Sequence, residues 1–489
     1  MSATFRQMKC RILLLQLQER ESTLNSSGIS KLLADIAAIT GPGGVLTGED
    51  VRSRQSSWLG HAGADVAALI RPASTGELSQ VMRHCHAAKQ AVVPLGGNTG
   101  LVDGALATGT ELFLSLERMN RIESLDAPGC TMTVQAGVPL QTVQQRADEA
   151  GLLFALDLGG RGSATIGGNI STNAGGNQVI RYGMMREQVL GLEAVLADGT
   201  IVSSMNRMLK NNAGYDLKQL FIGTEGTLGI VTRAVLRLRP AARSLNTAFV
   251  AADSFAAVST LLRELESNLG GTLHAFEVMW ADFYTTILGA SDRHTPPVGK
   301  GHPFYALIEA RGGSQEHDSK RFEQVLGKAL EANLIADAAI ASNRTQRQAL
   351  WAIRDDIDTL MKAMEPMIVF DVSLPLPDMP AYVDRVQLGL GKRWGANARC
   401  TTFGHVGDGN IHFCISVGSD APEASREVMD IVYRELEPIG GSVSAEHGIG
   451  LEKRPFLHYS RNEAEISLMR ALKQALDPHK LLNPGKIFG

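Results

Sequence analysis

The sequence predicts a protein of mixed α and β structure with two unlike parts, and two observations support this prediction. The chain has 51 glycines in 489 residues, and they gather at 96–104, 159–183, 223–229, 404–409 and 440–450. At residue 245 the pattern changes, and from there apolar strand-like segments alternate with amphipathic helix-like ones. Such alternation is typical of a sheet covered by helices.

Short strands and helices alternate in the first part. The capping box Ser74-Thr75-Gly76-Glu77 predicts a helix that ends near residue 88. The turn Asp198-Gly199, between alternating apolar residues, predicts a hairpin over 193–203. We also expect helices over 30–39 and 140–150, strands over 64–70, 91–95, 111–116 and 131–136, and a strand pair over 226–238.

The second part contains longer elements. Apolar segments predict strands at 247–251, 273–279, 304–309, 367–374, 400–403 and 411–417. Amphipathic periodicity predicts helices at 255–266, 320–332, 344–364, 381–392 and 423–437. The order of these elements indicates two successive βαβ-like halves on one sheet. The last 40 residues read as loops and one helix.

The composition excludes several functional classes. Lys+Arg 47 against Asp+Glu 51 gives a net charge of -4, which supplies no reason to expect nucleic acid or an anionic membrane as a partner. No apolar run approaches the roughly 18 residues that span a bilayer. The five cysteines form no CxxC pair, which suits the reducing cytoplasm, or the mitochondrial matrix of a eukaryote. We expect residues 1–27 to be a disordered extension, with a targeting peptide as the alternative.

Three glycine-rich loops in the first part leave many backbone N–H groups accessible. They are residues 94–100, 159–176 and 223–230. None of them matches the Rossmann or P-loop fingerprint. A single loop of this kind is better explained as a structural turn, but three in one domain favour a large polar cofactor that lies along the backbone.

The order of these motifs, together with Gly214-Tyr215-Asp216-Leu217, resembles the p-cresol methylhydroxylase/vanillyl-alcohol oxidase superfamily. From about residue 30 to 489 the chain is similar to its FAD-linked D-2-hydroxy-acid dehydrogenases, the branch of D-lactate dehydrogenases, glycolate oxidase flavoprotein subunits and D-2-hydroxyglutarate dehydrogenases. The resemblance implies an α+β fold, with a p-cresol methylhydroxylase-type FAD-binding domain over 28–243 and a ferredoxin-like substrate domain over 244–449. A C-terminal segment, 450–489, would return to the FAD-binding domain.

The resemblance also implies the FAD contacts. The first loop would hold the pyrophosphate, the second would line the rest of the cofactor, and Ile230 would meet the adenine side. Because no His occupies the first loop, we expect FAD to be bound non-covalently. The residues assigned to FAD by motif are Pro94, Gly96, Gly97, Asn98, Thr99, Gly100, Leu101, Gly160, Ser163, Thr165, Gly167, Asn169, Thr172, Asn173, Gly175, Gly176, Gly226, Gly229, Ile230 and Asn483.

His405 and His412 lie seven residues apart across a glycine-rich turn, and Glu446-His447 follow later. Spacing alone indicates a divalent-metal site only weakly, since the chain has 12 His and a lone His is more often structural. The resemblance assigns His405, His412 and Glu446 to zinc or manganese, and His447 to the base. This set suits oxidation of a D-2-hydroxy acid to the 2-oxo acid: the metal lowers the hydroxyl pKa, His447 takes the proton, and hydride moves to flavin N5.

Arg354 lies four residues before Asp358 in the expected helix 344–364. A surface ion pair between the two would explain this spacing, and such pairs are worth only a few tenths of a kcal/mol. The alternative, which the resemblance favours, is a catalytic Arg354 whose guanidinium binds the substrate carboxylate.

Three positions depart from the D-2-hydroxyglutarate branch, which carries Lys, Thr and Asn where this chain has Val369, Asp358 and Cys414. The donors for a second carboxylate are therefore depleted, and we expect D-lactate or another D-2-hydroxy monocarboxylate, with D-2-hydroxyglutarate as the alternative. Two rival hypotheses remain: a sugar or lactone oxidase of the same fold, which would lack the metal cluster, and a flavin-binding subunit without catalysis. We expect a separate electron acceptor (an electron-transfer flavoprotein, a quinone or a cytochrome), and a homodimer is compatible with the sequence.

Overall fold

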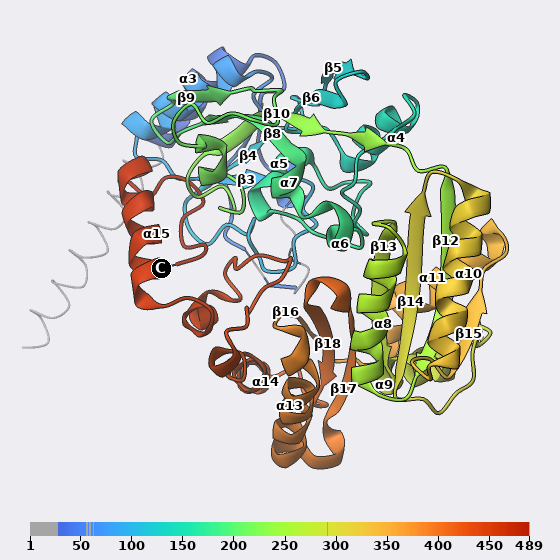
Figure 1. Ribbon diagram of the computed structural model, residues 1–489. Coiled ribbons are helices and arrows are strands. Elements are labelled where there is room, and N and C mark those ends of the chain that lie inside the picture. The colour runs from blue at the N-terminus through green and yellow to red at the C-terminus, as the bar shows by residue number, and fades with distance from the viewer. Residues whose placement is uncertain (1–27, 55–56, 58–59, 62, 291, 489) are drawn as a thin grey trace, which may run out of the picture.

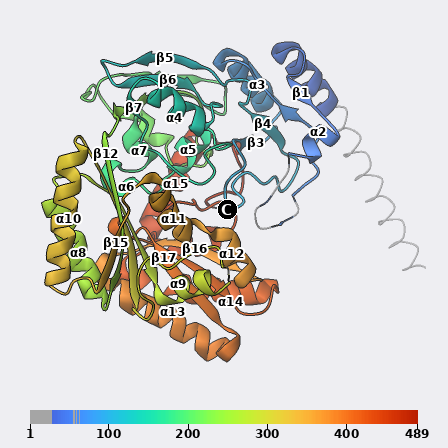
Figure 2. The same cartoon turned by 90° about the vertical axis from the view of Figure 1, so that its right-hand side faces the viewer.

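The computed structural model describes residues 28–54, 57, 60–61, 63–290 and 292–488 (Figure 1). The extension expected at 1–27 lies outside these described residues. We refer to residues 28–240 as the N-terminal half and to residues 244–449 as the second half. In the views of Figures 1 and 2 the N-terminal half lies above the large sheet of the second half.

The N-terminal half contains two main sheets. One has four strands in the order β1-β2-β4-β3, of which β2, β4 and β3 run parallel, and the other has five antiparallel strands in the order β5-β6-β10-β8-β9. The strands are β1 Val45–Leu46, β2 Leu69–Ile70, β3 Val92–Leu95, β4 Leu112–Ser115, β5 Ile122–Asp126, β6 Thr131–Gln135, β8 Val189–Val195, β9 Ile201–Ser204 and β10 Ile230–Arg237. A two-stranded ribbon joins β7 Leu152–Leu153 to β11 Arg239–Pro240. The described residues 28–40 are helical, and the following helices are α2 Glu49–Arg52, α3 Thr75–Ala87, α4 Leu140–Asp148, α5 Ile166–Thr172, α6 Val179–Tyr182 and α7 Met185–Gln188.

Two local predictions for this half are confirmed and one is wrong. Helix α3 begins at the expected cap, where the Ser74 hydroxyl accepts the N–H of Glu77. The hairpin forms between β8 and β9, and Gly199 takes a positive φ of 84° in its turn. The strand pair over 226–238 is instead the single strand β10. Glu225 and Gly226 take positive φ angles of 51° and 72°, the turn that they begin extends to residue 229, and 230–237 run as one uninterrupted strand.

The second half forms a seven-stranded antiparallel sheet in the order β15-β12-β14-β13-β17-β18-β16. The four strands β15, β12, β14 and β13 lie in the order of a ferredoxin-like unit. The strands β17, β18 and β16 belong to a second such unit, and β13 pairs with β17 to join the two units in one sheet. That second unit lacks its fourth strand, and only a bridge between Ser373 and Ser442 stands in its place. The strands are β12 Ser244–Ala252, β13 Leu273–Trp280, β14 Phe304–Gly312, β15 Asp337–Ile340, β16 Ile368–Ser373, β17 Arg399–Gly404 and β18 Asn410–Ser416.

Helices cover both faces of this sheet. Alternate residues of β12 point to opposite faces: Val250 packs in the core with α8, α10, α13 and α14, and Phe249 packs in the core with α9, α11 and α12. The sequence did not predict α9 or β15. The helices are α8 Phe255–Asn268, α9 Ala281–Ala290, α10 Gln315–Glu331, α11 Arg344–Asp355, α12 Ile357–Ala363, α13 Met379–Trp394 and α14 Pro422–Arg434.

The single helix expected over 344–364 is wrong, because the chain breaks at Asp356. Asp356 has non-helical angles (φ -78°, ψ 62°), and its carboxylate caps α12 by accepting the N–H of Thr359. The carboxylate also lies 2.7 Å from Nε2 of His294. Arg354 and Asp358 therefore lie on different helices.

The C-terminal helix α15, Glu463–Leu476, lies against the N-terminal half (Figure 1). The buried ammonium of Lys473 donates to the carbonyl oxygens of Thr227 and Leu482, each at 2.8 Å. Beyond the helix, Leu482 forms a parallel bridge with Val92 and is buried in the core of the N-terminal half. Within the residues the structure describes, no helix combines the length and apolar character needed to cross a membrane.

Removing the Leu482 side chain should destabilise the core that the C-terminal segment completes. Leu482→Ala removes a fully buried side chain, and such changes typically cost about 2–5 kcal/mol. Urea unfolding followed by tryptophan fluorescence should show a lower midpoint. Leu468→Ala is the matched control, because Leu468 is exposed on α15 and its loss should leave the midpoint within error. Equal midpoints for the two variants would contradict the packing described here.

Candidate active site

The three glycine-rich loops converge on a cavity of about 780 Å³ in the N-terminal half. All the residues assigned to FAD by motif line this cavity except Ser163, Asn173 and Gly229. The cavity wall also includes Ile357 at the start of α12, and the neighbouring side chains Glu446 and His447. Loops from distant parts of the chain therefore enclose one space large enough for an extended ligand.

Glycine is required in these loops where backbone approaches backbone. A Cβ at Gly97 would overlap the carbonyl oxygen of Ser163, so the first and second loops can meet only without a side chain there. Gly176 has a positive φ of 117°, and a Cβ on it would overlap the carbonyl oxygen of Asp157. These contacts close the cavity wall with backbone rather than with side chains.

The three exceptions do not line the cavity but contact residues of the loops or their neighbours. Ser163 provides the carbonyl that Gly97 approaches, and Gly229 packs against the ring of Phe221. Asn173 ends helix α5 in the left-handed conformation, and its side-chain oxygen accepts the N–H of Arg186 at 2.9 Å. Their positions suit residues that shape the loops.

The cavity fits a polar cofactor such as FAD. Nδ2 of Asn169 faces no acceptor among the described residues although the side chain is buried, and Asn169 lines the cavity. A buried donor without a partner is costly, and a ligand that accepts from it would remove that cost. The backbone of the glycine loops adds N–H groups of the kind that hold phosphate oxygens.

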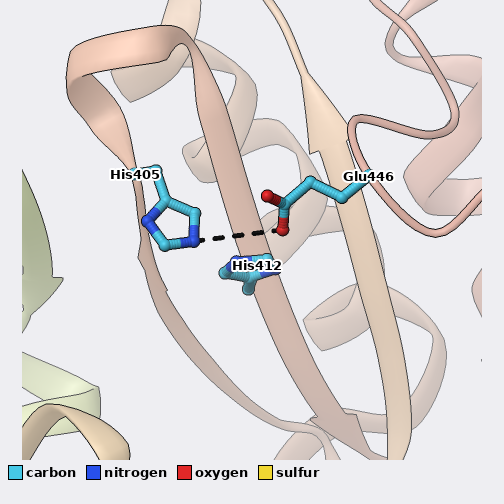
Figure 3. Close-up of side chains that lie close together, drawn as sticks. All are labelled: His405, His412 and Glu446. Carbon is cyan, nitrogen blue, oxygen red and sulfur yellow. Dashed lines mark ion pairs between the residues drawn. The ribbon is translucent and has the colours of Figure 1, made fainter. Parts of the chain in front are cut away.

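His405, His412 and Glu446 meet beside this cavity, with their ligand atoms within 4.8 Å of one another (Figure 3). His405 follows β17, His412 lies on β18, and Glu446 comes from a loop beyond α14. Nε2 of His405 lies 3.9 Å from Oε2 of Glu446. Two imidazole nitrogens and one carboxylate oxygen could hold a metal ion, and catalytic divalent-metal sites use donor sets of this type.

A buried carboxylate orients His405. Glu277 on β13 pairs with Nδ1 of His405 through Oε1, and its Oε2 accepts Nε of Arg354 at 2.9 Å. Burial alone would raise the pKa of Glu277, but the charges of His405 and Arg354 outweigh it and lower the pKa to about 2. The ionised Glu277 favours the proton on Nδ1 and leaves Nε2 facing Glu446. Metal-binding histidines are commonly oriented in this way by a carboxylate on their other ring nitrogen.

Arg354 lies next to this cluster and makes no pair with Asp358. Its guanidinium lies over the ring of Phe403, 4.8 Å from the centroid, and pairs with Glu277. Asp358 is exposed on α12 and Arg354 pairs with Glu277, so a surface ion pair between Arg354 and Asp358 does not explain their spacing. Val369 on β16 pairs with Cys414 on β18. The pair Asp371 and His412 lies two residues further along the same strands and therefore on the same face of the sheet.

Sequence reasoning missed Glu277 and gave Asp371 no role. The available signal was a charged residue inside an apolar strand, since Glu277 lies between Phe276 and Val278 and Asp371 between Phe370 and Val372. A buried carboxylate needs donors or positive charge. The sequence did not identify the partners, which are far away along the chain.

A second group, His61, Asp103 and Glu452, also has its ligand atoms within 4.8 Å. Nδ1 of His61 lies 2.6 Å from Asp103 and 3.3 Å from Glu452, so the imidazole already contacts both carboxylates. This geometry needs no metal ion.

The chain matches known flavoproteins along almost its whole length. The family model of a FAD binding domain matches residues 66–204, and that of the C-terminal domain of FAD linked oxidases matches residues 241–487. The mitochondrial D-2-hydroxyglutarate dehydrogenase of Rattus norvegicus is 37% identical over 446 residues, which cover 91% of this chain and 82% of that protein. A Schizosaccharomyces pombe protein, provisionally named a mitochondrial D-lactate dehydrogenase, is 35% identical over 448 residues, covering 89% of this chain and 84% of that one.

The fold is also found among solved structures. p-Cresol methylhydroxylase with substrate bound superposes with a TM-score of 0.75 at 16% identity, and the match covers 94% of this chain and 97% of that one. At this identity the match shows the fold alone, and it confirms the α+β architecture with a p-cresol methylhydroxylase-type FAD-binding domain.

Adding one methyl group at Gly97 should prevent FAD binding. Gly97→Ala places a Cβ against the Ser163 carbonyl and forces the two loops apart. The purified variant should contain little FAD when acid extracts are measured by absorbance. Gly162→Ala is the control, because its Cβ would meet only the Gln141 side chain at 3.4 Å and Gly162 lies outside the cavity wall. A Gly97→Ala protein with full FAD content would contradict the role assigned to this contact.

Proposed function

The chain belongs to the FAD-linked oxidases, an oxidoreductase family that uses FAD, and we propose that it oxidises a D-2-hydroxy acid to the 2-oxo acid. The observation that carries the proposal is the position of Glu446 and His447 in the wall of the glycine-lined cavity, with His405 and His412 beside them. Removing hydride from the substrate Cα and the proton from its hydroxyl oxygen requires an electron acceptor, a base and a group that acidifies the hydroxyl, all within reach of one another. A subunit without catalysis has no need of this set, and a sugar or lactone oxidase has no need of the metal ligands.

His447 is the base in this proposal. Its Nδ1 lies 3.9 Å from Oδ2 of Asp371, so the carboxylate favours the proton on Nδ1 and leaves Nε2 to accept the hydroxyl proton. Burial lowers the pKa of His447, which keeps the imidazole neutral and able to accept a proton at neutral pH. Arg354 uses Nε for Glu277, and its terminal N–H groups bind the substrate carboxylate.

Two bound groups complete the site. A divalent ion, zinc or manganese, held by His405, His412 and Glu446 would polarise the substrate hydroxyl and lower its pKa. FAD, held non-covalently by the cavity loops, would supply the acceptor for the hydride from the substrate Cα, at flavin N5. The residues of the N-terminal half bind the cofactor, and those of the second half orient the substrate against it.

We propose domain limits that separate the residues that bind the cofactor from those that orient the substrate. We assign cofactor binding to 28–243, the substrate site to 244–449 and the closing segment to 450–489. We propose a separate electron acceptor, which is an electron-transfer flavoprotein, a quinone or a cytochrome. We place the enzyme in the cytoplasm or the mitochondrial matrix, and the rat relative is named as mitochondrial.

For the substrate we propose a D-2-hydroxy monocarboxylate such as D-lactate. Beside His412 on the same sheet face stand Val369, Cys414 and Phe403, which offer no positive charge to a second carboxylate. D-2-hydroxyglutarate is the second candidate, because relatives at 36–38% identity are named for it. Asp358 gives no reason to prefer either substrate, because it is exposed on α12 and does not pair with Arg354.

Replacing a proposed metal ligand should abolish turnover without releasing FAD. His405→Ala and His412→Ala each remove one nitrogen donor, and neither residue belongs to the cavity loops. The variants should retain the flavin absorbance but lose bound metal, measured by plasma mass spectrometry, and at least about a thousandfold in kcat/KM, since metal-assisted catalysis supplies several kcal/mol. Full activity of a chelator-treated, metal-free wild type would rule out the metal assignment.

The substrate preference can be tested by steady-state kinetics with an artificial dye as acceptor. We expect kcat/KM for D-lactate to exceed that for D-2-hydroxyglutarate by about ten- to a hundredfold, the cost of a missing charge-assisted hydrogen bond. Val369→Lys should narrow or reverse the ratio by adding an ammonium to the apolar wall, and Val369→Met controls for size. A wild-type preference for the dicarboxylate would show that other donors line the pocket.

A further inference from the structure

Asp371 binds the backbone of the loop that carries Glu446 and His447. Its Oδ2 accepts three consecutive N–H groups, those of Ala445 at 3.1 Å, Glu446 at 2.8 Å and His447 at 2.9 Å. Its Oδ1 accepts Nδ2 of Asn410 at 3.2 Å. Asp371 lies near the C-terminal end of β16 and is fully buried. These hydrogen-bond donors therefore replace the water that the carboxylate loses on burial.

The position of this loop follows from the incomplete second ferredoxin-like unit. Ser373 and Ser442 exchange both backbone hydrogen bonds, at 3.1 and 2.7 Å, where the fourth strand of that unit would begin. After Ser442 the regular backbone pairing with β16 ends. The N–H groups of residues 445–447 instead donate to the side chain of Asp371, two residues before Ser373. The loop replaces the missing strand and depends on a side chain for the bonds that a strand would have made.

A second buried carboxylate holds the same loop from the N-terminal half. Glu225 accepts the N–H of Ile449 through Oε1 at 2.6 Å and that of Gly450 through Oε2 at 2.9 Å. Glu225 belongs to the third glycine loop and lines the cavity. Of the six N–H groups in residues 445–450, these two carboxylates accept five, and each carboxylate comes from a different half of the molecule.

The side chain of Glu446 is then fixed at both ends. Its backbone is held by Asp371, and its Oε1 accepts the N–H of Gly176 in the second glycine loop. Oε2 remains on the side of His405. Lys453, also buried, lies 3.6 Å from Oδ2 of Asp371 and balances its charge.

We propose that Asp371 and Glu225 are positioning residues that hold the 445–450 segment in the geometry that presents Glu446 to a metal ion and His447 to the substrate. The inference rests on the proposed function of Glu446 and His447. Neither carboxylate belongs to the proposed metal ligands His405, His412 and Glu446. Both act through the backbone they bind, and Asp371 also faces Nδ1 of His447 at 3.9 Å. Supporting groups of this kind commonly change metal affinity or activity by about 10- to 100-fold.

The test measures cobalt binding and kinetics in the FAD-loaded protein. Asp371→Ala and Glu225→Gln should weaken Co²⁺ binding, followed by its visible absorption bands, by about 10- to 100-fold, and should lower kcat more than they raise KM for D-lactate. Asp371→Asn should bind Co²⁺ more tightly than Asp371→Ala. Its amide oxygen can still accept the three N–H groups, and Oδ1 of Asn410, which has no partner among the described residues, can accept its amide N–H.

Asp282→Ala is the matched control. Asp282 also accepts two backbone N–H groups, those of Phe283 at 2.6 Å and Thr402 at 3.2 Å, but it belongs to α9 and lies outside the site. This variant should lose thermal stability while its Co²⁺ affinity and kcat stay at the wild-type values. It separates the general cost of removing a buried carboxylate from an effect on the site.

The outcomes are distinguishable. A wild-type protein that binds no Co²⁺ would overturn the proposed metal function. A wild-type protein that binds Co²⁺, with Asp371→Ala and Glu225→Gln binding it equally well, would overturn the positioning role alone. Equal losses in Asp371→Ala and Asp371→Asn would overturn the hydrogen-bond account of Asp371.

Discussion

A carboxylate removed from water must meet donors or positive charge, and this constraint organises the site from the inside. Glu277 meets it with His405 and Arg354, Asp371 with backbone N–H groups and Lys453, and Glu225 with the backbone beyond His447. Each solution fixes a group that the proposed reaction uses. The buried carboxylates therefore fix the positions of the proposed reacting groups through hydrogen bonds. Their own positions are set by the sheet and by the loops that line the cavity.

The two halves solve different physical problems. The N-terminal half encloses a large ligand, and it does so by letting backbone contact backbone at positions such as Gly97 and Gly176. The second half presents side chains from strand ends, where β17 and β18 place His405 and His412 beside each other. The two sets meet at Glu446, which touches Gly176 on one side and faces His405 on the other.

Most strands and helices of the second half could be predicted because each buries a continuous apolar face that periodicity reveals. The break at Asp356 could not, since it depends on a side-chain cap and on His294, 62 residues away. The pairing of His405 with Glu277 spans 128 residues, and no local pattern encodes such a contact. The grouping of His405, His412 and Glu446 follows from the family resemblance, because their spacing along the sequence is compatible with many arrangements.

The missing strand of the second ferredoxin-like unit has a consequence for how the protein behaves among its neighbours. β16 is the last strand of the seven-stranded sheet, and an unpaired edge is a template for association with other chains. Here the loop that carries Glu446 and His447 occupies part of that edge through the bridge at Ser373. The same segment therefore covers part of the β16 edge against pairing with other chains. A change that detaches this loop would expose unpaired backbone of β16 and would also displace Glu446 and His447.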